Sequence, residues 1–78
     1  MQLLRQMIQA VVRAGEESGF VAECTELAVV TQGKTLDETI ANLREAVDLH
    51  LEGEDLAEMG LSSSPTLVVA MEVQPIHA

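Results

Sequence analysis

The chain has 78 residues and a formal net charge of −9, from 13 acidic and 4 basic residues, and its one aromatic residue is a phenylalanine. A chain of this length fits one domain with a small core. Its few scattered cations and its single aromatic side chain argue against direct binding of nucleic acid. A single cysteine excludes an internal disulfide framework and favours a cytoplasmic protein, and no stretch approaches the roughly 20 apolar residues of a membrane span.

The first half of the chain reads as three short strands. Residues 7–14 and 20–27 alternate between two faces, as half-buried strands do. The polar, glycine-flanked residues 15–19 predict a five-residue hairpin connection between them. A third strand is predicted over residues 29–32, and the short connection before it requires antiparallel pairing with the second.

A helix is predicted over residues 35–52. Gly33 lets the preceding strand end abruptly, Thr35 is a good N-cap, and Glu38 stands where its side chain can reach back to the N–H of the cap. Gly53 is a natural C-terminal stop. The apolar positions follow a period near 3.6 residues; they are Leu36, Ile40, Leu43 and Val47, followed by His50 or Leu51.

The last strand is predicted over residues 66–73, after a loop that contains Gly60 and the Ser-Pro run before residue 66. The element order is therefore β-β-β-α-β in a single domain over residues 1–78. A right-handed crossover through the helix brings the last strand beside the first and parallel to it. This predicts an α+β fold with a four-stranded sheet of order 3-2-1-4 and one helix on one face.

One helix leaves the other face of this sheet uncovered. The alternation leaves two possibilities for that face. It carries Val11, Val21 and Val68, with Val29 a further candidate, or else Val12, Phe20 and Val69. Exposed apolar area of this kind usually marks a contact surface, so we expect a homo-oligomer, a bound partner, or both.

Catalytic and metal sites are poorly supported by the sequence. Cys24 could be a nucleophile with His50 or His77 as its base, but its strand position favours core packing. His50 has apolar neighbours one turn back, which favours an interaction with the helix dipole over a metal site. Gly33-Lys34-Thr35 lacks the earlier glycine of a P-loop. The remaining acidic cluster reads as a solvated surface and consists of Glu52, Glu54, Asp55 and Glu58. We therefore predict no catalytic residue, no metal ligand and no cofactor.

Several segments, at intact spacing between about Ile8 and Leu51, resemble the HicB-like antitoxin family. The resemblance implies a partial RNase-H-like fold without catalytic activity, homo-oligomers, and neutralisation of HicA toxins, which are small basic ribonucleases. No counterpart of the DNA-binding domain that many members carry after this domain is expected. The matching segments are Gly19-Phe20-Val21-Ala22-Glu23-Cys24, Glu26-Leu27, Val30-Thr31-Gln32-Gly33, Thr35-Leu36-Asp37-Glu38 and Ala41-Asn42-Leu43-Arg44-Glu45-Ala46.

The sequence departs from the family pattern at three places: Thr25 replaces a frequent Pro, Ala28-Val29 a frequent Pro-Gly, and Thr39 a frequent Ala. The first two leave the bend between strands two and three less rigidly specified.

The favoured hypothesis is a protein-binding domain that binds a HicA-type toxin. The alternatives are an orphan homo-oligomeric structural or regulatory domain of the same fold, and an enzyme that uses Cys24 or a carboxylate–metal site. The expected partner or oligomer surface consists of Val11, Arg13, Val21 and Glu23 on the sheet and Asp48 and Glu52 on the helix.

Overall fold

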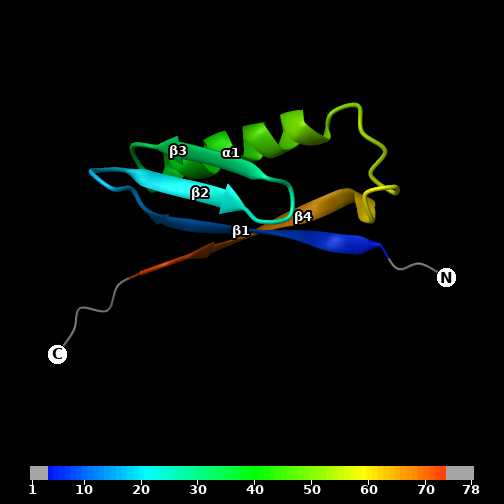
Figure 1. The fold of residues 1–78 in the computed structure, drawn as a ribbon, viewed down its shortest axis with the longest axis horizontal. Helices are drawn as coiled ribbons and strands as arrows, with labels where there is room; N and C mark the ends of the chain where they lie inside the picture. The colour runs from blue at the N-terminus through cyan, green and yellow to red at the C-terminus, as the bar shows by residue number, and fades with distance from the viewer. Residues whose placement is uncertain (1–3, 74–78) are drawn as a thin grey trace.

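A computed structural model describes residues 4–73 of the chain. Within these residues, four strands and one helix form a mixed sheet of order β3-β2-β1-β4 with the helix on one side (Figure 1), which confirms the predicted α+β arrangement. β1 pairs antiparallel with β2 and parallel with β4, and β2 pairs antiparallel with β3. The elements are β1 (Arg5–Ala14), β2 (Phe20–Cys24), β3 (Val29–Gly33), α1 (Leu36–Leu51) and β4 (Leu61–Met71).

The β1–β2 hairpin has the predicted five-residue connection. Ala14 pairs with Phe20, and the N–H of Gly15 donates to the carbonyl of Gly19 at 2.9 Å. Gly19 has a φ of +72°, and a Cβ there would lie 2.5 Å from the carbonyl oxygen of Gly33. Both the backbone conformation and the close approach of the next loop therefore require glycine at this position.

The second strand ends earlier than predicted, at Cys24 rather than at residue 27. Residues 25–28 form a turn in which Ala28 has a φ of +53° and Leu27 is directed inward, with 6% of its surface exposed. Cys24 then pairs with Val29, so both side chains lie on the helix side of the sheet. The suggestion that Val29 lies on the uncovered face is therefore wrong, since Val30 takes that place.

The predicted cap of α1 is confirmed, with one change. The N–H of Glu38 donates to Oγ1 of Thr35 at 3.1 Å, while Oε1 of Glu38 accepts from the N–H of Lys34 at 3.3 Å rather than from the cap residue itself. At the other end, Glu52 is the C-cap and Gly53 follows with a φ of +77°, the left-handed conformation that commonly ends a helix.

The buried face of α1 is centred on Thr39, Leu43 and Val47. Thr39 is fully buried, and its hydroxyl donates to the carbonyl of Thr35 at 2.7 Å, so the polar atom is satisfied inside the helix. The buried face of α1 is therefore rotated about the helix axis relative to the face that the apolar residues alone predict. Ile40 and Leu51, which belonged to that prediction, lie at its flank and are only partly buried.

Position 33 requires glycine because a side chain would not fit there, and not because the backbone has an unusual φ. A Cβ on Gly33 would lie 2.6 Å from Oγ1 of Thr39, 2.7 Å from its N and 2.9 Å from its Cα. The end of β3 therefore contacts the first turns of α1 directly. The side-chain amide of Asn42 strengthens this junction by donating to the carbonyl of Gln32 at 2.9 Å.

β4 begins at Leu61, within the segment predicted to be a loop, and ends at Met71 rather than at residue 73. Arg5 pairs with Leu61 and Met7 with Thr66, so β4 has three more residues than β1 between these two pairs. Pro65 lies in this irregular part, where a missing N–H disturbs the ladder least. Leu61 is 4% exposed and joins the core, which explains why a segment rich in serine is held against β1.

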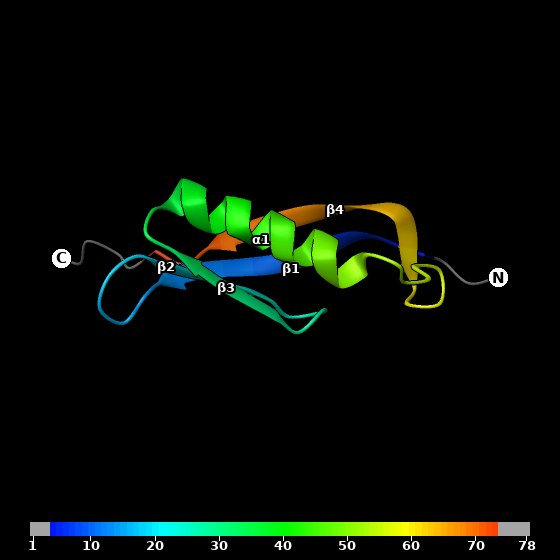
Figure 2. The same cartoon turned by 90° about the horizontal axis from the view of Figure 1, so that it is seen from above.

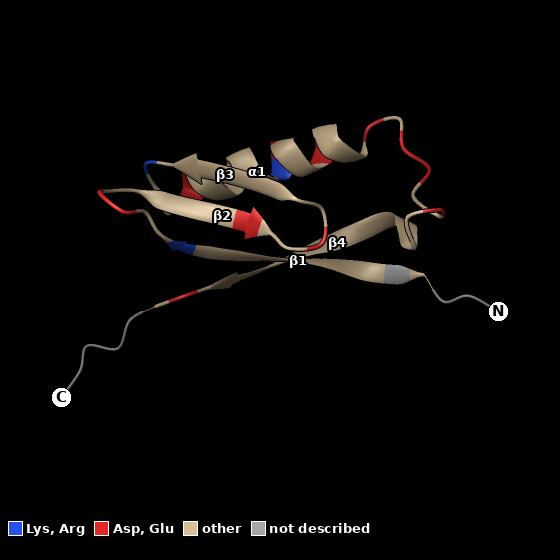
Figure 3. Cartoon of the chain, in the orientation of Figure 1, with Lys and Arg blue, Asp and Glu red and all other residues tan. Residues whose placement is uncertain are grey.

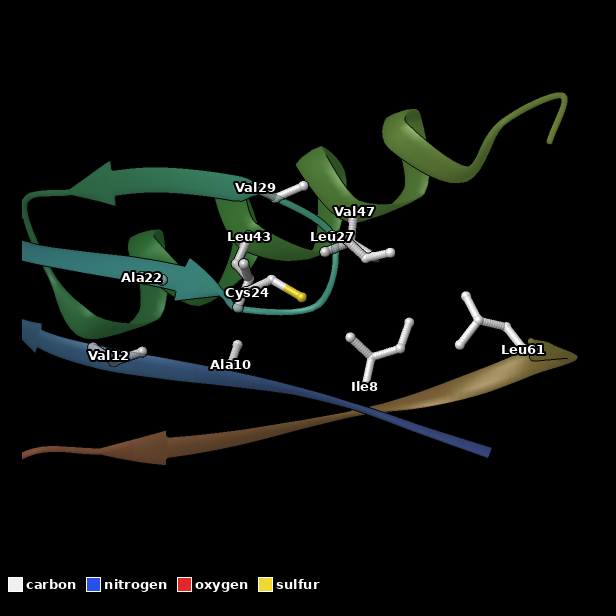
Figure 4. Close-up of a cluster of buried hydrophobic side chains, with 10 residues drawn as sticks. All are labelled: Ile8, Ala10, Val12, Ala22, Cys24, Leu27, Val29, Leu43, Val47 and Leu61. Atoms are coloured by element: carbon white, nitrogen blue, oxygen red, sulfur yellow. The ribbon is translucent and has the colours of Figure 1, made fainter. Parts of the chain in front are cut away.

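The core lies between the sheet and α1, as Figure 4 shows for its ten buried apolar side chains. Most of them come from alternate positions of the strands. They are Ile8, Ala10, Val12, Ala22, Cys24, Leu27, Val29, Leu43, Val47 and Leu61. Val12 and Val69 thus lie on the helix side of the sheet. Of the two sets of residues that the sequence offers for the uncovered face, the one with Val11, Val21 and Val68 is therefore correct.

We expect Gly33→Ala to lower the free energy of unfolding by about 2–3 kcal/mol, since a methyl group would be forced against the backbone of α1. Denaturant unfolding followed by circular dichroism measures this change. Gly53→Ala is the control, because nothing lies within 4 Å of its Cβ position and only its positive φ should cost about 1 kcal/mol. A Gly33→Ala variant as stable as the parent would contradict the described junction.

Ala28→Gly should stabilise the fold by up to about 1 kcal/mol. A left-handed conformation costs an alanine about 1–2 kcal/mol, and part of the gain is lost to the greater entropy of glycine in the unfolded chain. The same unfolding measurement checks this. A loss of stability would mean that residues 25–28 do not form the turn described here.

Candidate functional site

The side of the sheet opposite α1 is called the outer face here. Within residues 4–73 no helix lies over it, and Figure 2 shows α1 running obliquely across the other side. Its side chains come from all four strands at alternate positions. They are Met7, Gln9, Val11 and Arg13 of β1, Val21 and Glu23 of β2, Val30 and Gln32 of β3, and Thr66, Val68 and Ala70 of β4.

The register places apolar and charged side chains of the outer face in one continuous patch. One row across the strands is Val30, Glu23, Val11 and Ala70. The next row contains Val21 between Gln32 and Arg13. Val30 is 62% exposed and Val68 is 38% exposed, so the patch is open to solvent.

An ion pair lies within this patch. Nη1 of Arg13 is 3.3 Å from Oε1 of Glu23, and the two side chains are 42% and 43% exposed. The pair connects β1 and β2 diagonally between Val11 and Val21. It neutralises the charge at the centre of the patch while leaving hydrogen-bonding atoms accessible from solvent.

Glu26 lies at the margin of the outer face, just beyond the end of β2. Its Oε1 accepts a hydrogen bond from the N–H of Gln9 at 2.9 Å. The turn thus supplies an acceptor to β1 at a point where β2 no longer pairs with it. This contact gives Glu26, one of the residues that match the HicB-like pattern, a structural role.

A groove lies on the helix side, between α1 and β4. α1 packs against β3 and β2, which leaves apolar side chains toward β4 only partly covered. The groove has a volume of about 660 Å³. Its lining includes Ile8, Ile40, Val47, Leu51, Leu56, Leu67 and Val69, with Arg44, Asp48 and Glu52 along the helix and Ser63, Ser64 and Pro65 opposite.

The structure divides the predicted surface residues into two separate groups. Val11, Arg13, Val21 and Glu23 come together on the outer face, whereas Asp48 and Glu52 line the groove on the other side of the sheet. Sequence reasoning missed Val30, because it depends on the turn before β3. It also missed the groove, because the helical period assigns Ile40 and Leu51 to the same face as the buried Leu43 and Val47.

The cysteine and histidine considered for chemistry lie apart from both surfaces. Cys24 is fully buried in the core, as its strand position predicted. His50 is exposed in the last turn of α1, consistent with the dipole interpretation, and His77 lies outside the described residues. Between residues 4 and 73, no group of three or more His, Cys, Asp or Glu side chains is placed to hold a metal ion. None of the helical segments in this part of the chain combines the length and apolar character needed to cross a bilayer.

Acidic side chains are concentrated around the ends of the sheet and on α1 (Figure 3). Glu16 and Glu17 lie in the β1–β2 loop, and Glu54, Asp55 and Glu58 follow the helix. All five are exposed. A partner that approaches either face would therefore meet a negative potential around an apolar centre.

No protein-family model matches the chain, and searches of curated proteins and of solved structures find no significantly similar protein.

We expect the Arg13–Glu23 pair to contribute little to folding. A double-mutant cycle with Arg13→Ala and Glu23→Ala, measured by denaturant unfolding, should give a coupling energy below about 1 kcal/mol, because both side chains remain substantially in solvent. The coupling should fall further at 1 M salt. A coupling above about 2 kcal/mol would instead identify the pair as a structural element of the fold.

Proposed function

We propose that this chain is a non-catalytic protein-binding domain that acts like a HicB antitoxin and binds a small basic ribonuclease of the HicA type through its outer face. The observation that carries the proposal is the uncovered apolar patch across all four strands. A patch that includes Val30 at 62% exposure has no partner within the described residues. Exposed patches of this kind mark interaction sites.

The charge of the chain supports a basic partner. The chain carries 13 acidic and 4 basic residues, and one of the basic residues, Arg13, is already paired with Glu23. A protein that binds RNA must carry a cationic surface, because it neutralises phosphates. The opposite charges of the two proteins would speed their encounter, and the apolar centre of the outer face would hold them together.

The sequence pattern supports the choice of partner class. The segments that resemble the HicB-like family build β2, part of the turn after it, most of β3 and much of α1. Of these, β2 and β3 contribute to the outer face, and the turn contributes Glu26 at its margin. Coverage of the cationic surface of the ribonuclease would keep RNA from it. Neutralisation in this sense requires no catalytic group in the present chain.

The test uses any small basic protein that is encoded beside this chain's gene. Isothermal titration should detect binding, and the complex should cleave RNA more slowly than the basic protein alone. Val30→Lys, which places a like charge opposite the partner, should weaken binding by about tenfold or more.

Leu49→Lys is the matched control, because Leu49 is also 62% exposed but lies on α1. It should leave the affinity within about twofold of the parent. Failure of any such neighbouring basic protein to bind would refute the proposed function. Equal weakening by the two substitutions would refute the role of the outer face.

A further inference from the structure

The two edges of the sheet differ in how their backbone groups are satisfied. At the β3 edge, α1 packs closely, and the side chain of Asn42 donates to the carbonyl of Gln32 at 2.9 Å. A helix over an edge strand is one of the ways in which proteins prevent edge-to-edge pairing. The β3 edge is therefore partly protected.

The β4 edge is open. The N–H of Glu72 donates to the carbonyl of Val12 at 2.8 Å, which fixes the side of β4 that faces β1. Because backbone groups alternate along a strand, the N–H groups of Leu67, Val69 and Met71 point away from β1. No strand in the described part of the chain lies beyond β4.

β4 also lacks the charges that normally protect an edge. Residues 59–71 are the longest run in the chain without Asp, Glu, Lys or Arg, in a protein with a net charge of −9. Figure 3 shows this contrast, since β4 carries neither red nor blue. Two copies of so acidic a chain repel each other, and an uncharged edge is where they can approach at the lowest electrostatic cost.

From these observations we propose that a second copy of this chain binds along the free edge of β4, with the two β4 strands antiparallel about a two-fold axis. Pro65 and the three extra residues before Thr66 interrupt the first part of the strand, so the paired segment is residues 67–71, in which outward-facing residues lie opposite one another. A two-fold axis makes the contact self-complementary and closed, so it yields a dimer and not a fibre.

Pairing in this way also extends the apolar burial. Leu67 and Val69 line the groove at its β4 side and are only partly buried in one copy. Two adjoining β4 strands bring these side chains beside those of the other copy and place the two grooves next to each other on the helix side of the joined sheet. The pairing also joins the two outer faces into one continuous sheet surface.

A second copy fits this edge better than a basic partner does. The edge offers no carboxylate for a cation, whereas it offers unpaired N–H groups and apolar side chains to an identical uncharged strand. The inference does not depend on the proposed function, because it concerns the purified chain alone.

Sedimentation velocity of the full chain between about 1 and 200 μM should show a dimer. Met71→Pro should raise the dimer dissociation constant at least about tenfold, because it removes an outward N–H without removing a hydrogen bond to β1. Its far-UV circular dichroism spectrum should match that of the parent. Val30→Lys, at the other edge of the sheet, should leave the dimer intact.

A charge-exchange experiment keeps the test valid if the proline variant does not fold. Val68→Lys and Val68→Glu should each weaken the dimer, and an equimolar mixture of the two should restore it. A chain that stays monomeric at 200 μM would overturn the inference. So would a dimer that resists both changes at Val68 and at Met71, or one that Val30→Lys dissociates.

Discussion

The sixteen residues of α1 have to shield one side of a four-stranded sheet, and most of the structure follows from this constraint. A single helix is narrower than four strands that lie about 5 Å apart. α1 therefore covers the strands to which it is tied, β3 and β2, and leaves a groove beside β4 and an entire open face behind.

The position of α1 is fixed at its first turns. Gly33 brings the backbone of β3 against Thr39 with no room for a methyl group, and Asn42 binds the same strand. Because these contacts anchor the helix to the β3 edge, they also determine that the opposite edge remains uncovered. The close approach at Gly33 and the open edge at β4 thus both result from the position of α1 beside β3.

The two uncovered surfaces suit different partners. The outer face mixes apolar side chains with the Arg13–Glu23 pair and is surrounded by acidic loops, which favours a basic protein of a different kind. The β4 edge is uncharged and offers backbone groups, which favours an identical chain. Since the surfaces do not overlap at their centres, a dimer formed at β4 would present two copies of the outer face to partners.

Much of the fold could be predicted from local signals. Thr35, Glu38 and Gly53 mark the ends of α1, the glycines around residues 15–19 mark the hairpin, and the element order leads to the sheet order through the handedness of the crossover. These features depend on neighbouring residues and on general rules of chain connection, so the sequence contains them directly.

The sequence by itself therefore determined the elements, their order and the existence of an uncovered apolar face. Only the tertiary structure decided which residues occupy that face and which line the groove. Val30 lies on the outer face because the turn before β3 contains Ala28 in a left-handed conformation. Thr39 can be buried because Gly33 has no side chain to displace it, and Leu61 extends β4 because its side chain packs into the core. Each of these depends on contacts between distant segments, which periodicity along one element does not encode.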